Sequence, residues 1–347
     1  QLGIGIKDLS RVTPVTVCNI SNAVAMAMGT TRSMALLTDG TVRTWGAGTS
    51  GQLGIGSIID MSSAVTPCNI SNAVAIACGG SAAAVLLADG TIRTWGGNTY
   101  GQIGIGTAVS QTSPVTPCNI SNAVAIAAGL YNMAAVIADG TVYVWGRGDQ
   151  GQLGTGWTNG SQLTPVQAIN ISNAVAVSCG SLHTAVLLAD GTMRTWGANG
   201  TGYLGIGTLV SQLSPVTPCN ITNAIAIAAG NQNTAALLAD GTMRVWGIGS
   251  SGILGIGSTI DMSTAVTPTG VSTLNIVKPS LTLSNINYAT GLSVYTQIMN
   301  ISNGFQPGTA GARGIAIVDA SGTWQYSVDA SATWQDIGAV SAGTALL

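Results

Sequence analysis

The stretch Leu86–Gly96 reads LLADGTIRTWG, and the chain contains this pattern five times. Apolar residues alternate with other residues on both sides of an Asp-Gly pair, which is the strongest short-range signal for a β-hairpin. A tight turn needs positive φ at its two central residues, and Asp followed by Gly tolerates this best. Each copy is therefore predicted to form a strand, a tight turn and a second strand that ends in Trp-Gly. The other copies begin at Leu36, Val136, Leu187 and Leu237.

The tryptophans of these copies recur at a nearly constant interval. Trp45, Trp95, Trp145, Trp196 and Trp246 are 50, 50, 51 and 50 residues apart. A period near 50 with several strands per unit indicates a propeller or a solenoid. One full repeat contains four predicted strands, around residues 73–77, 83–88, 91–96 and 115–118. Repeats of this length with four strands are typical of β-propeller blades.

The strand sequences also predict how the blades pack. In Ala73–Ala77, alternation places Val74 and Ile76 on one face and only Ala on the other, which suits an innermost strand near the propeller axis. The tryptophan of each Trp-Gly pair is expected to pack between blades, because an aromatic ring buries a large area between sheets. The glycines of the GQLGIG motif at Gly51–Gly56 are expected to bend the chain sharply between blades.

The composition is unusually poor in charge. Charged residues make up 6% of the 347 residues, against about 25% in an average soluble domain. All twelve acidic residues are Asp, and the formal net charge is −2. No basic stripe is present that could neutralise phosphates, which argues against nucleic-acid binding. Few strong helix formers predict an almost entirely β structure, and no apolar run is long enough for a membrane span.

The repeated DGTxRTWG and GQLGIG motifs over residues 1–268 resemble the regulator-of-chromosome-condensation repeat family, whose units read roughly VxxIAAGxxHxxALxxDGxVxxWGxNxxGQLGxG. The resemblance implies a β-propeller, usually of seven blades. Five complete repeats are visible, so we predict an all-β fold with a propeller of six or seven four-stranded blades over residues 1–270. The first repeat is incomplete, and residues 13–17 are predicted to form an outer strand whose inner strands are absent.

The repeat stops after Pro268. The segment GTWQYSVDASATWQDIGAVSAGTALL at the C-terminus resembles a module of large secreted bacterial adhesins with cadherin-like repeats. Residues 271–347 are therefore expected to form a small β-sandwich-like module, which either is incomplete or completes the propeller. Related modules occur among calcium-dependent repeats, so Asp319, Asp329 and Asp336 are candidate calcium ligands, although no recognised ligand loop is present. No other cofactor is expected.

No catalytic arrangement is visible. His183 is the only histidine, and no Ser-His-Asp, Cys-His or phosphate-binding loop pattern appears, so the chain is predicted not to be an enzyme. The periodic Asp residues are interpreted as turn residues rather than cation ligands. Four arginines share one repeat position and form either an anion-binding arc or contacts within their own blades. They are Arg43, Arg93, Arg194 and Arg244.

Three further residue sets are candidates for surface roles. The six cysteines lack a C-x-x-C motif and lie at equivalent positions of different blades, which favours small buried thiols over disulfides. Trp157 lies outside the Trp-Gly pattern and is a candidate recognition residue. Five N-I-[ST] motifs are either glycosylation sites of a secreted protein or simply turns into the innermost strands. They begin at Asn19, Asn69, Asn119, Asn170 and Asn220.

These features favour a non-catalytic extracellular or cell-surface protein whose propeller is a platform for binding a protein or glycan. The adhesin-like segment, the acidity from Asp alone and the low charge motivate this hypothesis. An alternative is a structural subunit that polymerises head to tail into an extracellular filament, sheath or surface layer, since incomplete ends of two copies could complete each other. A remote alternative, implied by the family resemblance, is a regulator similar to a guanine-nucleotide exchange factor.

Overall fold

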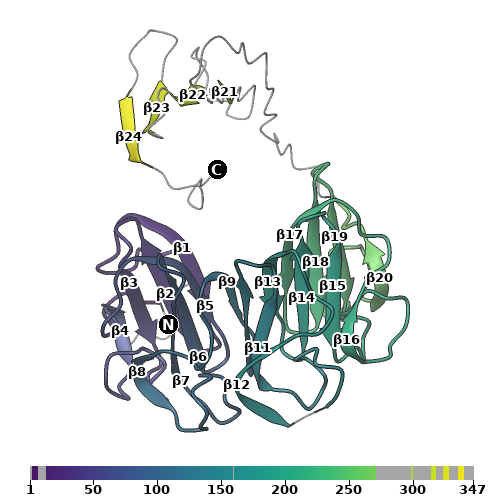
Figure 1. Ribbon diagram of the computed structural model, residues 1–347, viewed down its shortest axis with the longest axis horizontal. Coiled ribbons are helices and arrows are strands. Elements are labelled where there is room, and N and C mark those ends of the chain that lie inside the picture. The colour runs from purple at the N-terminus through teal and green to yellow at the C-terminus, as the bar shows by residue number, and fades with distance from the viewer. Residues whose placement is uncertain are drawn as a thin grey trace. The chain divides into compact units, whose positions relative to one another are not determined.

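The structure, a computed structural model, describes residues 2–6, 13–158 and 160–270 and the backbone of four strands near the C-terminus. Nearly all of the regular structure is β, which confirms the predicted fold class (Figure 1). The helical structure within these ranges is a single 3-10 turn at Ser250–Gly252. No helix in this part of the chain has the length and apolarity needed to cross a membrane.

The chain divides into two compact units. One comprises residues 1–238 with 242–272, and the other comprises residues 273–347 with 239–241. The first unit contains five four-stranded sheets, and the second contains one antiparallel sheet in the order β21-β22-β23-β24. The strands of that second sheet are β21 (Ile298–Met299), β22 (Gly314–Ile317), β23 (Thr323–Ser327) and β24 (Gln335–Ala339).

The five sheets of the first unit repeat one design, with four antiparallel strands in sequence order from an inner to an outer strand. The first two blades are β1 (Ala23–Met28), β2 (Arg32–Leu37), β3 (Val42–Gly46), β4 (Met61–Val65), and β5 (Ala73–Cys78), β6 (Ala82–Leu87), β7 (Ile92–Gly96), β8 (Gln111–Val115). The third and fourth are β9 (Ala123–Ala128), β10 (Asn132–Ile137), β11 (Val142–Arg147), β12 (Ser161–Gln167), and β13 (Ala174–Cys179), β14 (His183–Leu188), β15 (Met193–Gly197), β16 (Gln212–Val216). The fifth is β17 (Ala224–Ala229), β18 (Asn233–Leu238), β19 (Met243–Gly247), β20 (Met262–Val266).

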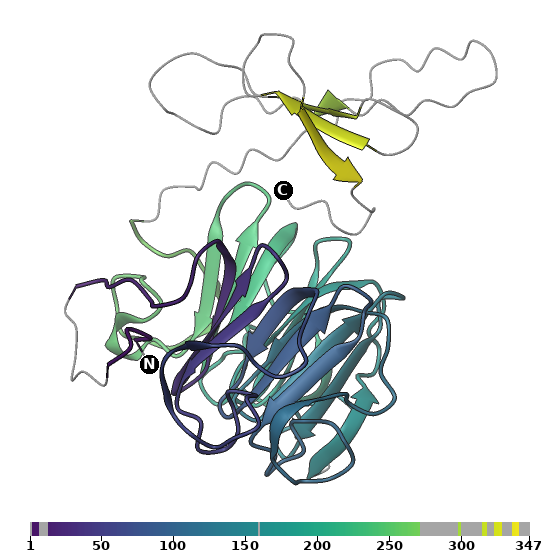
Figure 2. The same cartoon turned by 90° about the vertical axis from the view of Figure 1, so that its left-hand side faces the viewer.

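The blades pack side by side in sequence order (Figure 1, Figure 2). Their inner strands contact one another in the series β1, β5, β9, β13 and β17. At the beginning of this series β1 is exposed along almost its whole length, and at its end β17 is exposed at half of its residues. The five described blades therefore form an open arc in which the three central blades are covered on both faces.

The Asp-Gly pairs form hairpin turns, but the predicted turn type is wrong. Gly90 has φ +79°, whereas Asp89 is not among the residues with positive φ. Four residues rather than two separate β6 from β7, and the amide of Gly90 donates to the carbonyl of Leu87 at 3.0 Å. Asp89 has a different role, because its Oδ1 accepts hydrogen bonds from the amide and hydroxyl of Thr91 at 2.9 and 2.7 Å. These bonds lower the pKa of Asp89.

A β-bulge interrupts the alternation of each inner strand. In β5, Ala73 pairs with Leu87 but Ala75 pairs with Leu86, so Val74 is an extra residue, and its side chain is exposed. The predicted all-Ala face is wrong at its first residue, because the bulge moves Ala73 to the opposite face of the strand.

The outer strand of the second blade begins earlier than predicted. It is β8, which ends at Val115, and residues 116–118 lie beyond it. Pro114 is tolerated there because an outermost strand bonds to a neighbour on one side only. The amide of Cys118 instead donates to the carbonyl of Gly104 at 2.9 Å.

The start of the described chain also differs from the prediction, because residues 13–17 carry no strand. Residues 2–6 instead follow the path that the GQLGIG motif takes in the later blades. The amide of Gly5 donates to the carbonyl of Ser62 at 2.9 Å. The amide of Cys18 donates to the carbonyl of Gly3 at 2.8 Å. This segment therefore packs on the first blade as each later loop packs on the blade that follows it.

The tryptophans of the Trp-Gly pairs pack between blades, as predicted, and all five are buried. Trp95 of β7 belongs to one cluster with Met34 and Leu36 of the first blade. Its Nε1 donates to the carbonyl of Gln52, in the loop that leaves the first blade, at 3.0 Å. Three others donate to equivalent carbonyls at 2.7, 2.9 and 2.9 Å: Trp145 to Gln102, Trp196 to Gln152 and Trp246 to Tyr203.

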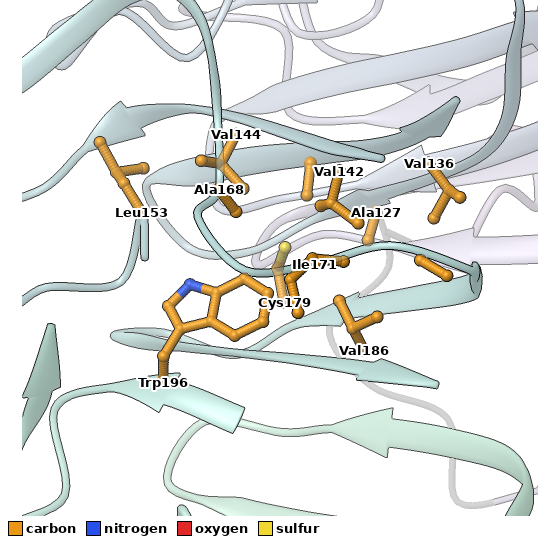
Figure 3. Close-up of a cluster of buried hydrophobic side chains, with 12 residues drawn as sticks. Ala127, Val136, Val142, Val144, Leu153, Ala168, Ile171, Cys179, Val186 and Trp196 are labelled. Carbon is orange, nitrogen blue, oxygen red and sulfur yellow. The ribbon is translucent and has the colours of Figure 1, made fainter. Parts of the chain in front are cut away.

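Glycine brings the preceding loop onto each ring. Gly54 has φ +71°, and a Cβ atom at this position would lie 2.7 Å from Nε1 of Trp95. Figure 3 shows the equivalent junction between the third and fourth blades, where Trp196 lies in one cluster with Leu153 and Ile171. Each junction therefore combines a buried ring, a hydrogen bond to the preceding loop and a glycine that leaves no room for a side chain.

A matched pair of tryptophan variants tests this packing. We expect Trp95→Ala to lower the free energy of unfolding by about 3–5 kcal/mol, because it opens a cavity between blades and leaves the Gln52 carbonyl without its donor. Trp157→Ala, which removes an exposed ring, should change it by less than about 0.5 kcal/mol. Chemical denaturation of both variants measures the difference, and equal effects would contradict the assigned role of Trp95.

Candidate functional site

Antiparallel pairing places the turns that follow the inner strands and the loops that follow the third strands at one end of the first unit, which we call the loop end. The Asp-Gly turns lie at the opposite end, the hairpin end. At the loop end, five equivalent turns line a widely open cavity of about 370 Å³ near the axis. They are residues 28–30, 78–80, 128–130, 179–181 and 229–231.

Glycine at the middle of each turn sets the width of this cavity. A Cβ atom on Gly79 would lie 2.3 Å from the carbonyl oxygen of Gly129, and one on Gly129 would lie 2.3 Å from that of Gly180. Backbone hydrogen bonds also link the turns, because Gly80 donates to Gly129 at 3.3 Å and Leu130 donates to Gly180 at 3.4 Å. The cavity wall is therefore largely backbone, held at a fixed spacing.

A buried cation lies behind one of these turns. The side chain of Arg32 is 1% exposed, its Nη1 donates to the carbonyl of Gly80 at 3.1 Å, and its Nη2 donates to the carbonyl of Ala82. Burial lowers the pKa of Arg32, and the adjacent Cys78 opposes this shift. Within the part of the chain that the structure describes, no carboxylate forms an ion pair with Arg32.

The equivalent residues of the third and fourth blades are neutral. Nδ2 of Asn132 donates to the hydroxyl of Thr184 at 3.4 Å, and Nε2 of His183 lies 2.9 Å from the hydroxyl oxygen of Thr234. That hydroxyl donates to the carbonyl of Tyr203, so it accepts from Nε2, which carries the imidazole proton. Burial lowers the pKa of His183 to about 4. Each of these side chains links its blade to the next one through a hydrogen bond.

A cluster of aromatic and charged side chains interrupts the repeat at the loop end. The rings of Tyr100 and Tyr131 meet edge to face with centroids 5.0 Å apart, and the guanidinium of Arg147 lies 5.4 Å from both centroids. Asp149 accepts two hydrogen bonds from Arg147 at 2.7 Å, which lower the pKa of Asp149. The other blades have small or apolar residues at the Arg147 position: Ala47, Gly97, Ala198 and Ile248.

Comparison with known proteins agrees with this architecture. Residues 1–296 match the family model described as RCC1-like domain. The chain belongs to this family. A crystal structure of yeast RCC1 (Prp20) bound to Kap60 is similar with a TM-score of 0.64 and 21% identity, over 71% of this chain and 61% of that one. Human WBSCR16 is similar with a TM-score of 0.65 and 23% identity, over 71% of this chain and 67% of that one.

Prp20p from Saccharomyces cerevisiae gives the same result, with a TM-score of 0.63 and 20% identity over 75% of this chain and 65% of that one. The RCC1-like chain therefore spans about three fifths to two thirds of these structures. Likeness at such identities shows the fold alone. No curated protein sequence matches the chain.

The periodic arginines of the RCC1-like propeller lie at the hairpin end and bond within their own blades. Arg194 donates to the carbonyl of Met193 at 2.8 Å. The other three donate through Nη1 to a threonine hydroxyl that follows the outer strand: Arg43 to Thr66, Arg93 to Thr116 and Arg244 to Thr267. This geometry favours contacts within each blade over an anion-binding arc.

The asparagines of the N-I-[ST] motifs are exposed, and their backbone is left-handed. Their φ angles lie between 53° and 61°, a region that Asn enters more readily than most residues. The turn alone therefore explains why Asn recurs at this position, and glycosylation stays a prediction. The residues are Asn19, Asn69, Asn119, Asn170 and Asn220.

The remaining candidates are scattered. Trp157 is 56% exposed in the β11–β12 loop at the loop end. All six cysteines are free, and burial raises the pKa of Cys179 to about 12.

The candidate calcium ligands fall mostly outside the structure. Asp319 and Asp329 lie outside the described residues, and only the backbone of Asp336, in β24, is described. In the described ranges, no group of three or more His, Cys or acidic residues could hold a metal ion.

The cavity, Arg32 and the Tyr100–Tyr131–Arg147–Asp149 cluster were not predicted from the sequence. A signal for the cluster was nevertheless present. When the repeats are aligned with one another, the third blade carries an aromatic residue at 131 and charges at 147 and 149, where its neighbours have small, apolar or polar uncharged residues. Breaks in an otherwise regular repeat mark positions that the scaffold itself does not require.

The buried imidazole predicts a specific pH dependence of stability. The pKa of His183 in the folded protein is about 4, below its value of 6.5 in the unfolded chain, so the unfolded chain binds the proton first. Stability should therefore be complete above pH 6.5 and fall by up to about 3 kcal/mol as the pH drops from 6.5 towards 4.

The control is His183→Asn, because Asn occupies the equivalent positions 132 and 233. Urea denaturation of this variant should show a nearly flat free energy of unfolding between these pH values. An unchanged decline in the variant would show that another group carries the dependence.

Two substitutions at Asn119 distinguish a requirement for Asn in the turn from a requirement for Asn as a glycosylation site. Both Asn119→Gly and Asn119→Ala remove the glycosylation motif, but only glycine adopts φ near 53° without strain. We expect the alanine variant to lose about 1–2 kcal/mol of stability and the glycine variant to lose much less. Thermal unfolding of both proteins, purified from the native source, measures this. Equal losses would mean that the sugar, rather than the turn, requires Asn.

Proposed function

We propose that this RCC1-like protein is non-catalytic and acts outside the cell or at a cell surface, where its propeller binds a protein or glycan partner. The observation that carries the proposal is the cluster of Tyr100, Tyr131, Arg147 and Asp149. Tyr and Arg are enriched among residues that dominate binding energy. The ring contact and the two hydrogen bonds hold these side chains in place, which reduces the entropy lost when a partner binds.

The position of the cluster also supports a binding role. Tyr131 directly follows Leu130, which lines the axial cavity, so aromatic and concave surfaces adjoin at the loop end. Protein interfaces and sugar sites both use aromatic side chains next to polar groups. The extracellular placement rests on the low charge of the chain and on the resemblance of residues 322–347 to a secreted adhesin module.

A function like that of the similar yeast structures is less well supported. The structure of Prp20p is described together with its binding to Gsp1p and histones. Histones are basic, and this chain is poor in acidic side chains to bind them, because it has twelve Asp and no Glu in 347 residues. Since 6% of the residues are charged, the chain also has few charged side chains for contacts with a small GTPase. We expect no stimulation of nucleotide exchange when the protein is added to one.

Assembly between copies is a second candidate, favoured by one observation. The inner strand β1 exposes Met26 and Met28 by 60% and 74%, whereas the equivalent residues of the next blade, Ile76 and Cys78, are partly buried. An apolar strand face of this kind can be covered by an equivalent surface of another molecule. Analytical ultracentrifugation across a range of protein concentrations distinguishes assembly from a monomeric binding platform.

The aromatic cluster can be tested directly with the full chain. Tyr131→Ser and Arg147→Ala should each weaken binding of the fluorescently labelled protein to intact cells at least about tenfold, because loss of a central Tyr or Arg removes much of an interface's energy. Flow cytometry before and after treatment of the cells with protease or glycosidase identifies the partner class.

Arg93→Ala is the matched control, because it removes an equal charge at the hairpin end and should leave binding unchanged. Unchanged binding of both cluster variants would contradict the proposed site. Detection of the native protein only in the cytoplasm of its source would contradict the extracellular role.

A further inference from the structure

Exposed apolar side chains recur at neighbouring repeat positions on the loop end, 12 to 14 residues after the tryptophan of each Trp-Gly pair. Each lies in the loop between the third and fourth strands of its blade, and each is between 56% and 64% exposed. We call this set the rim tips: Ile58, Ile59, Val109, Trp157, Leu209, Val210 and Ile260. No two blades present the same side chains, but every described blade presents at least one of them.

Hydrogen bonds hold the backbone beneath several tips in a fixed shape. Nδ2 of the buried Asn98 donates to the carbonyls of Thr107 and Val109 at 2.7 and 3.0 Å. Asn199 makes the same two bonds in the fourth blade, at 2.7 and 3.2 Å. In the first blade, Asp60 accepts from the amide of Gly48 at 2.9 Å instead. The tips are therefore presented by ordered loops.

The described charges are segregated between the two ends of the propeller. The hairpin end carries the four periodic arginines and the Asp-Gly carboxylates. At the loop end, Arg147 is paired with Asp149, Arg32 is buried, and Asp60 and Asp261 accept bonds from backbone amides. The hairpin end thus carries side chains of both charges, whereas the loop end combines the apolar tips with one paired arginine and the exposed carboxylates of Asp60 and Asp261.

We propose that the loop end docks on a zwitterionic lipid bilayer, with the rim tips inserted into the interfacial layer. Equivalent positions of successive blades lie at one height around the axis, so the four equivalent tips can reach a flat surface together. They are Ile59, Val109, Val210 and Ile260, and the other three tips are adjacent to this position or two residues before it. The tips project singly or as pairs of neighbouring residues, and each blade contributes one such projection. A folded protein partner would need a matching pocket for each tip, whereas a fluid lipid bilayer can accommodate all of the tips.

The residue types and the scarcity of basic side chains agree with a neutral bilayer. Trp and Tyr are favoured at the membrane interface, and Trp157, Tyr100 and Tyr131 all lie at the loop end. A surface that attracts anionic lipids needs clustered Lys or Arg, whereas at the described loop end Arg147 is partly exposed and paired with Asp149, and Arg32 is buried. This inference goes beyond the proposed protein or glycan partner and does not depend on it.

The test is co-sedimentation of the full chain with phosphatidylcholine vesicles. We expect binding that stays constant between about 0.05 and 0.5 M salt, since apolar insertion is not screened. Replacement of one pair of tips, Ile58→Ser with Ile59→Ser, should weaken vesicle binding about tenfold, and Leu209→Ser with Val210→Ser should do the same. Because these side chains are exposed, the variants should retain the wild-type melting temperature.

Val24→Ser with Met26→Ser is the matched control, since it removes equally exposed apolar groups from β1 rather than from the rim and should leave vesicle binding unchanged. The proposal is overturned by absence of binding to phosphatidylcholine, by binding only to anionic vesicles with loss at high salt, or by equal loss in the control. It is also overturned if the tip substitutions abolish self-association without changing vesicle binding.

Discussion

The structure depends on one repeated contact, in which a buried tryptophan donates to a carbonyl of the preceding blade's loop. Trp95 and Gln52 illustrate it, and a left-handed glycine, Gly54, brings the loop close enough for the bond to form. The ring supplies the buried area, the hydrogen bond fixes its orientation, and the glycine fixes the separation of the blades. Because the same three elements recur, successive blades meet through the same contact along the arc.

Much of the fold could be predicted because these elements are local and repeated. The Asp-Gly hairpins, the buried tryptophans and the glycine loops each have a signal within a few residues of sequence. The turn type and the bulge at Val74 could not be predicted, because both depend on the register between strands. The residues of the candidate site were harder to predict than the fold. Arg32, Asn132 and His183 share one repeat position but differ in chemistry. Their common structural role is visible only from the contacts that each makes with the next blade.

A regular scaffold also makes irregular residues informative. The blades tolerate Ala, Gly or Ile where the third blade has Arg147, so packing alone does not require a cation at this position. The paired arginine lies against two tyrosines and remains partly exposed, which keeps it available to a partner. The buried Arg32 has a different role. It donates hydrogen bonds to carbonyls of the second blade and so links the first blade to the second.

Stability in such an arc is approximately a sum of contacts between neighbouring blades, so it is unequal along the chain. In the third blade, β10 is buried at all but its last residue, whereas in the fifth blade buried and partly buried residues alternate along β18. The fifth blade should therefore open more readily than the central ones. The aromatic cluster spans the second and third blades, so it lies where both faces of the sheets are covered. A binding surface on this part of the arc keeps its geometry even when the fifth blade opens.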